Sequence, residues 1–168
     1  MEEFIYTRKL GSLYYDKIIF DGPYPILFTL IDDNKNLFLC VCHNRDTEQS
    51  NWLLTNTSPS DIISLLTNRI TIRKAFLLHD EIRYSITRKP NELLIEENVY
   101  DDWCSNSSVL PDDAYLDAED GEYNEELLYY AGFTKDNIDT LFGTLSNMEK
   151  IDVKEYIINL ITGKVVNA

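Results

Sequence analysis

The sequence has few of the residues and motifs on which most catalytic sites depend. Its 168 residues include two histidines and six glycines. No stretch matches a Gly-rich phosphate-binding loop or the G-x-S-x-G turn of a serine nucleophile. The three cysteines are odd in number and lack the spacing of a disulfide framework. We therefore expect a protein with reduced thiols, no cofactor and no enzymatic activity.

Long hydrophobic runs are also missing. The longest apolar runs span about six residues, far short of the roughly 20 residues that a membrane-spanning helix needs. The N-terminal stretch MEEFIYTRKL lacks the basic region and apolar core of a secretory signal. These absences predict a cytoplasmic protein.

Strand-forming residues, in contrast, are plentiful. The chain has 11 Tyr and 7 Phe, and aromatic residues favour sheets. Segments 26–31 and 37–42 are apolar on both faces and flank the polar loop DDNKN, which predicts a hairpin of two central strands. The motif DGP at Asp21–Pro23 predicts a turn. Further strands are predicted at 4–20, 51–56, 81–88 and 92–100.

Helical patterns occur in two parts of the chain. Ser58 suits a helix N-cap and is followed by Pro59 at the first helical position, and a second short helix is predicted from Thr71. The segment NEELLYYAG ends in a glycine suited to the position after a helix C-cap. Amphipathic helices are also predicted at 134–145 and 152–163.

These patterns predict an α+β fold: an antiparallel, curved sheet or small barrel with a helical pair, followed by a helical C-terminal part. The predicted boundaries are a β-rich domain with the helical pair at 1–100, an acidic connector at 101–122 and the helical C-terminal part at 123–168.

Basic residues are absent from one long part of the chain. Residues 90–134 hold 13 acids and no Lys or Arg, whereas the other 16 acids nearly balance the 15 bases. Almost all of the net charge of −14 therefore lies in this window. Aromatic residues are interleaved with the acids, and protein interfaces combine charge for steering with aromatic anchors. We predict a docking surface for a basic protein, formed by Trp103, Asp112, Asp113, Tyr115, Asp117, Glu119, Asp120, Glu122 and Tyr123.

The predicted function is that of a binding protein, such as an immunity protein, an antitoxin, or an inhibitor or accessory of a defence system. An alternative is a structural or regulatory subunit of a complex, in which the apolar C-terminal helix makes the contact. The acidic segment would then be a solvated linker that self-repulsion extends.

Metal-dependent functions have weaker support. A carboxylate enzyme would use the acids Asp101, Asp102, Asp112 and Asp113. A calcium loop is disfavoured, because counting back from Gly121 puts Leu116 where an EF-hand needs Asp.

Zinc and nucleic-acid binding are not predicted either. On a strand, Cys40 and Cys42 point to one face and His43 to the other, so the three cannot meet at one ion. Asp152, in the tripeptide DVK, is better explained as a helix N-cap than as a nuclease ligand. The basic residues are scattered, which disfavours direct contact with nucleic acid.

Four motifs follow one another along the first half of the chain. They are FDGP at Phe20–Pro23, WLL at Trp52–Leu54, SPSDIISLL at Ser58–Leu66 and ITIRKAF at Ile70–Phe76. In this order the chain resembles a family of bacterial domains of unknown function, which share a DGP turn, a Trp-Leu strand and an I-x-L-R-x-A-F segment. The resemblance covers about residues 1–90, and Ile72 departs from the family's Leu. It implies a bacterial or phage origin and supplies no catalytic residue.

Overall fold

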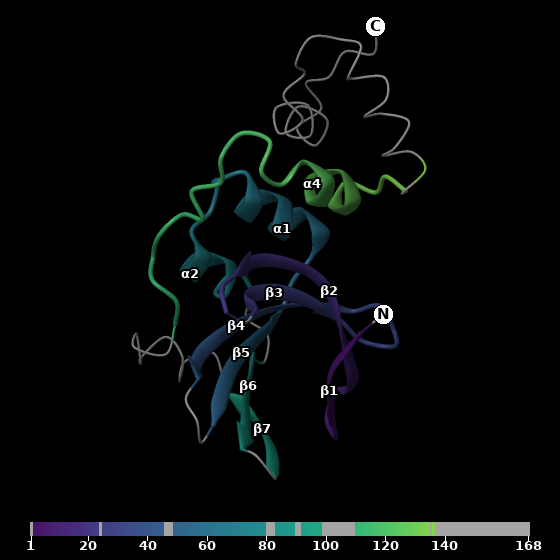
Figure 1. Ribbon diagram of the computed structural model, residues 1–168, viewed down its shortest axis with the longest axis vertical. Helices are drawn as coiled ribbons and strands as arrows, with labels where there is room; N and C mark the ends of the chain where they lie inside the picture. Colours follow the sequence, from purple (N-terminus) through teal and green to yellow (C-terminus); the bar gives the residue numbers. More distant parts are fainter. Residues whose placement is uncertain are drawn as a thin grey trace, which may run out of the picture. The chain divides into compact units, whose positions relative to one another are not determined.

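The computed structural model describes residues 2–23, 25–45, 49–79, 83–89, 92–98, 110–134 and 136. Within these residues the chain forms seven strands and three helices (Figure 1). Two compact units are present. The first, here called the sheet unit, comprises Met1–Ser58 and Ile72–Ala114, and the second, the helix unit, comprises Pro59–Thr71 and Tyr115–Ala168.

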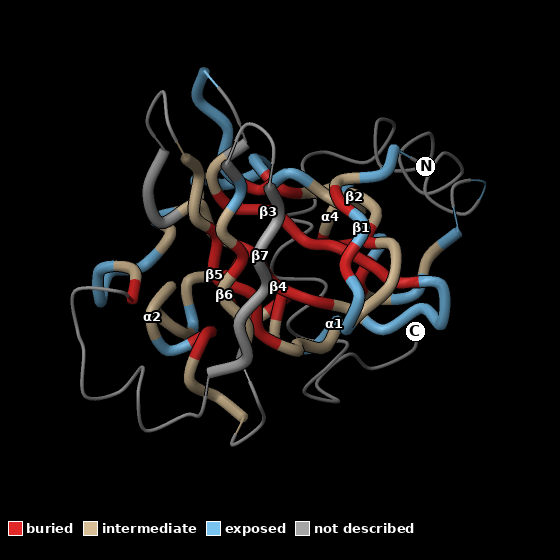
Figure 2. The backbone as a smooth tube through the Cα atoms, turned by 90° about the horizontal axis from the view of Figure 1, so that it is seen from below, coloured by how far each residue is buried: buried red, intermediate tan, exposed pale blue. Residues whose placement is uncertain are grey.

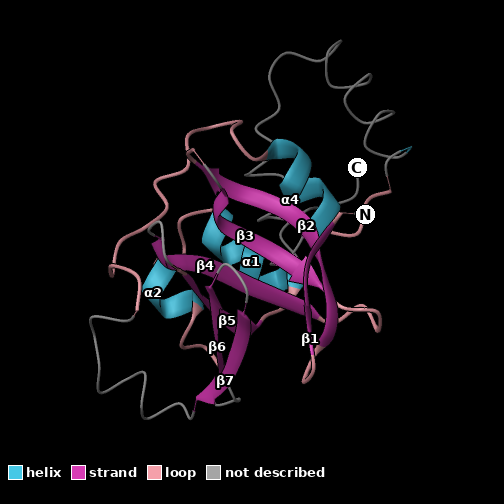
Figure 3. Ribbon diagram, turned by 60° about the horizontal axis from the view of Figure 1, so that its bottom comes forward, coloured by secondary structure: helices cyan, strands magenta, loops and turns pink. Residues whose placement is uncertain are grey.

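All seven strands belong to one antiparallel sheet, in which each strand pairs with the next along the chain. The sheet curls strongly (Figure 3), which confirms the predicted α+β class with a curved antiparallel sheet. The hairpin predicted for segments 26–31 and 37–42 is present. The strands are β1 (Glu3–Thr7), β2 (Gly11–Asp21), β3 (Pro25–Ile31), β4 (Leu37–Arg45), β5 (Ser50–Asn56), β6 (Arg83–Lys89) and β7 (Glu92–Asn98).

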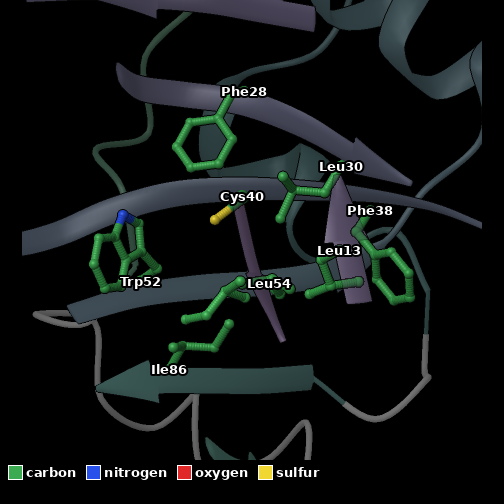
Figure 4. Packing of buried hydrophobic residues seen from close by; sticks show 9 residues of the cluster. Leu13, Phe28, Leu30, Phe38, Cys40, Trp52, Leu54 and Ile86 are labelled. Atoms are coloured by element: carbon green, nitrogen blue, oxygen red, sulfur yellow. The ribbon is translucent and has the colours of Figure 1, made fainter. Parts of the chain in front are cut away.

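The core of the sheet unit lies on one face of this sheet. Figure 4 shows the side chains that gather there, and the ring of Phe4 packs edge-on against Phe28 and Trp52 with centroids 5.3 Å apart. The cluster consists of Ile5, Leu13, Phe28, Leu30, Phe38, Cys40, Trp52, Leu54 and Ile86.

The central strands are buried on both faces. Leu27, Leu39 and Leu53 alternate with the residues of the core cluster and are each at most 2 % exposed. Figure 2 shows the resulting run of buried residues along β3 and β4. This confirms the prediction that the two-faced apolar segments form central strands.

The loop between β3 and β4 closes around the carboxylate of Asp32. Its Oδ1 accepts hydrogen bonds from the backbone nitrogens of Asn34 and Asn36 at 2.9 and 2.8 Å, and its Oδ2 accepts one from Asn36 Nδ2 at 2.9 Å. Lys35 takes a left-handed conformation with φ of 66°. An Asp side chain that binds the main chain ahead of it is the usual device for reversing a chain, and it explains why this polar loop joins two apolar strands.

Three helices are described: α1 (Pro59–Leu66), α2 (Ile72–Ala75) and α4 (Asn124–Tyr130). Helix α1 begins at Pro59, as predicted. Helix α4 is followed by Gly132 (φ 97°), whose N–H donates to Tyr129 O at 3.1 Å, while Phe133 N–H donates to Leu128 O at 3.0 Å. This is the Schellman pattern, which the glycine permits. The helices predicted at 134–145 and 152–163 lie outside the described residues.

Helix α1, which the sequence analysis groups with the β-rich segment, lies in the helix unit together with α4. The predicted domain boundaries stay a prediction. The side chains buried in these two helices are Ile62, Ile63, Leu65, Leu66, Leu127, Leu128 and Tyr130.

Two phenylalanines on neighbouring strands test the position of the core. Phe28 is fully buried, whereas Phe20 is 51 % exposed. Phe28→Ala should lower the free energy of unfolding by about 3–5 kcal/mol, because it removes buried apolar surface and leaves a cavity. The matched change Phe20→Ala should cost less than about 1 kcal/mol. Urea titration followed by tryptophan fluorescence measures both, and equal losses would contradict the assignment of the core face.

Candidate protein-binding surface

The described part of the acidic segment, residues 111–123, precedes α4 and is here called the acidic loop. Its acidic residues are exposed, and no Lys or Arg occurs between residues 90 and 134. Glu125, in the first turn of α4, is exposed as well. The exposed acids of the loop are Asp112, Asp113, Asp117, Glu119, Asp120 and Glu122.

The first residues of the acidic loop are tied to the sheet unit by their carbonyl groups. Arg73 Nε donates a hydrogen bond to Pro111 O at 2.8 Å, and Ile72 N–H donates to Ala114 O at 2.8 Å. The main chain also bonds to itself, because Ala114 N–H donates to Asp112 O at 2.8 Å. Asp112 and Asp113 are therefore presented by a fixed backbone.

Further along, the loop is held within the helix unit by Asn68, which follows α1. Asn68 Nδ2 donates to Ala118 O at 3.1 Å, and Ala118 N–H donates to Asn68 Oδ1 at 3.0 Å. The amide side chain thus pairs with one residue as a neighbouring strand would. Asn68 and Asp117 each have φ of 58°, a conformation that Asn and Asp adopt more readily than other residues with a Cβ. An extended linker driven apart by its own charge would not have these bonds.

A tight turn joins the acidic loop to α4. Glu122 N–H donates to Glu119 O at 3.1 Å, and Gly121 supplies the positive φ of 85°. The carboxylate of Glu122 accepts a hydrogen bond from the backbone nitrogen of Glu119 at 3.0 Å. Even in the turn, main-chain bonds fix the positions of the acids.

The aromatic residues of this region divide into two kinds. Tyr115 and Tyr129 are 55 % and 40 % exposed, whereas Tyr123 and Tyr130 are 8 % and 7 % exposed. Tyr123 is thus part of the buried interior of the helix unit, and its predicted contact with a partner stays a prediction. Trp103 lies outside the described residues.

Two exposed residues of α4 were absent from the predicted set. Glu125 and Tyr129 are one helical turn apart on the face opposite the buried Leu127 and Leu128. Helical periodicity applied to NEELLYY would have identified them, since its leucines mark the inward face.

Burial and nearby negative charge perturb Tyr123. Removal of the phenol from water raises its pKa to about 12, to which the charge of Glu122, a hydrogen bond to Glu122 and the charge of Glu126 also contribute. Each of these effects disfavours the phenolate. Tyr123 therefore stays neutral in the folded protein well into alkaline solution.

The other candidate sites gain no support from the geometry. In the part of the chain that the structure covers, no group of three or more His, Cys, Asp or Glu side chains is placed to hold a metal ion. Burial, and to a smaller extent Cys42, raises the pKa of the Cys40 thiol well above its ordinary value, and a neutral buried thiol is a poor ligand and nucleophile. Asp101, Asp102 and Asp152 lie outside the described residues, as does the side chain of His43.

One shallow hollow of about 240 Å³ lies over the β3–β4 loop, lined by Tyr14, Asp32, Asp33 and Lys35. Both oxygens of Asp32 are already engaged by the loop itself. Its carboxylate therefore has a structural role in the loop.

Comparisons of the chain with protein-family models, with curated proteins and with solved structures found no match. The resemblance to bacterial domains of unknown function stays a prediction.

None of the helices that the structure describes is long and apolar enough to cross a membrane.

The role of Asn68 in holding the acidic loop is testable with Asn68→Gly. Glycine keeps the left-handed backbone conformation and removes both hydrogen bonds to Ala118. The free energy of unfolding should fall by about 1–3 kcal/mol, and the amide of Ala118 should exchange with solvent faster. Amide hydrogen exchange measured by mass spectrometry reports the second effect.

Asn34→Gly is the matched control, since Asn34 is an exposed turn residue of the sheet unit. It should leave exchange at Ala118 unchanged. Unaltered exchange at Ala118 in Asn68→Gly would mean that Asn68 does not hold the loop.

The raised pKa of Tyr123 has a consequence for stability in alkali. In the unfolded chain the phenol ionises near its ordinary value of 10, and in the folded chain near 12. Between these values the unfolded state binds fewer protons, so the contribution of Tyr123 to stability is complete below 10 and disappears as the pH rises to 12. Wild type should therefore lose more unfolding free energy across this range than Tyr123→Phe. Tyr115→Phe controls for the loss of one exposed phenol, and identical pH slopes for all three proteins would contradict the assignment.

Proposed function

We propose that this chain is a non-enzymatic binding protein that docks on a basic protein through the acidic loop and the exposed side of α4. The observation that carries the proposal is the localisation of charge: 13 of the 29 acids lie in residues 90–134, where no base occurs. A charge pattern of this kind accelerates the encounter with an oppositely charged partner.

Exposed aromatic side chains complement this charge. Tyr115 lies between Asp113 and Asp117 in the chain, and Tyr129 is one turn after Glu125 on α4. Tyrosine and tryptophan are enriched among the residues that dominate binding energy, because they bury a large area at low entropic cost. In this proposal the carboxylates govern the rate of association, and the tyrosines govern the lifetime of the complex.

The class of partner follows from the sign of the charge. Proteins that act on nucleic acid carry clefts lined with Lys and Arg, which bind phosphate. A fixed row of carboxylates competes with phosphate for such a cleft. We therefore place the chain among immunity proteins, antitoxins and inhibitors or accessories of defence systems, of bacterial or phage origin and acting in the cytoplasm.

A triple neutralisation tests the proposal. Asp117→Asn, Glu119→Gln and Asp120→Asn together remove three exposed charges from the acidic loop, and Asn suits the left-handed conformation at residue 117. In parallel pull-downs from the native host, wild type should capture a basic protein that the triple variant captures poorly. The association rate with that protein should fall with rising salt, since screening acts beyond about 8 Å at physiological ionic strength.

The matched control removes three exposed acids, two Glu and one Asp, from the sheet unit by Glu2→Gln, Glu3→Gln and Asp33→Asn. It should retain the partner. Capture that all three proteins share equally, or that ignores salt, would overturn the proposal that the acidic loop is the contact.

A further inference from the structure

Besides reversing the chain, the turn motif DGP places a backbone nitrogen beside a side-chain carboxyl group. At the end of β2, the backbone nitrogen of Gly22 lies 3.0 Å from Oδ1 of Asp21 and donates a hydrogen bond to it. Asp21, Gly22 and Pro23 are all exposed. The main-chain nitrogen is thus held beside the carboxyl group of the preceding residue, in contact with water.

This juxtaposition matches the start of succinimide formation. The nitrogen of Gly22 attacks Cγ of Asp21, an N–Cγ bond forms, the carboxyl oxygen leaves as water and the nitrogen loses its proton. Water then adds to the five-membered ring. Opening at Cγ restores aspartate, and opening at the α-carbonyl carbon yields isoaspartate, in which the chain runs through the side-chain carbon. One water is released and one is consumed, so no oxidant, reductant or co-reactant is needed.

Glycine in the second position is the least hindered nucleophile, because no Cβ crowds the nitrogen. The hydrogen bond to Oδ1 holds the nitrogen of Gly22 near the carboxyl group, and reactions between groups that are held close together are favoured over those whose groups must first meet. The oxygen contacted by Gly22 is bonded directly to the carbon under attack.

The chain contains a second Asp–Gly pair that provides an internal comparison. Asp120 and Gly121 are also exposed, but they occupy the middle of the turn closed by Glu122 N–H and Glu119 O at 3.1 Å. Gly121 has φ of 85°. Between these two described residues, no hydrogen bond joins the backbone nitrogen of Gly121 to the carboxylate of Asp120.

We propose that Asp21–Gly22 is a site of spontaneous isoaspartate modification, favoured by the native fold over Asp120–Gly121. Isoaspartate lengthens the main chain by one carbon. Asp21 pairs with Pro25 at the end of the β2–β3 ladder where the chain turns from one strand to the next, beside a shift in register between Phe20 and Asp21. The modification would therefore loosen this end of the sheet and leave the core cluster in place.

The experiment is an ageing assay on the full-length protein. Purified protein is incubated for several weeks at physiological temperature in mildly acidic buffer, because the neutral carboxylic acid is the form from which water can leave. Trypsin separates the two sites, since Lys17 and Lys35 bracket Asp21, whereas Asp120 lies in the peptide that ends at Lys135. Electron-transfer fragmentation then distinguishes isoaspartate from aspartate at each position.

In the folded protein, isoaspartate should accumulate at Asp21 at least about fivefold faster than at Asp120. In guanidinium the two rates should become similar, because both pairs then have the same local chemistry. Asp21→Glu should abolish the modification at position 21, while the matched Asp120→Glu leaves that at Asp21 unchanged. Equal rates in the folded protein, or a rate at Asp21 that rises on unfolding relative to Asp120, would overturn the proposal.

Discussion

Mutual repulsion among carboxylates is the constraint that the acidic loop has to satisfy. Eight acids occupy residues 111–126, and the segment has no basic side chain of its own. Two like charges 4 Å apart repel by about 1 kcal/mol in water. The loop keeps its conformation despite this repulsion, because its main chain forms hydrogen bonds with Ile72, Arg73 and Asn68. These bonds use backbone groups of the loop, and its six acidic residues are exposed.

The elements of the fold follow from local patterns. Strands apolar on both faces could be identified as central ones, and Pro59 and Gly132 mark helix ends through conformations that proline and glycine favour. The assignment of α1 to the helix unit could not be foreseen, because an amphipathic helix buries its apolar face equally well against a sheet or another helix. Tertiary contacts decide whether such a helix packs against a sheet or against another helix.

The exposed acids of the candidate surface could be predicted from the sequence, but its exposed aromatic residues could be predicted only in part. The six acids of the predicted set are all exposed, since charged side chains are rarely buried without a partner. Tyr115 and Tyr123 have similar acidic neighbours, yet only Tyr115 is exposed. An irregular loop has no period that would separate an inward from an outward tyrosine. Likewise, the hydrogen bonds between Asn68 and Ala118 join residues 50 positions apart, and no local sequence pattern predicts such a contact.

A loop that is already ordered and already repelling itself favours a basic partner in two ways. First, binding costs little conformational entropy, because the backbone around Asp112 and Ala118 is fixed before the partner arrives. Second, cations placed between the carboxylates relieve a repulsion that the free protein carries, so part of the binding energy is stored in the unbound fold. A flexible acidic tail would gain less, because it can separate its charges in the free state. Anchoring of the main chain that leaves the acidic residues of the loop exposed is the arrangement that the proposed electrostatic docking would require.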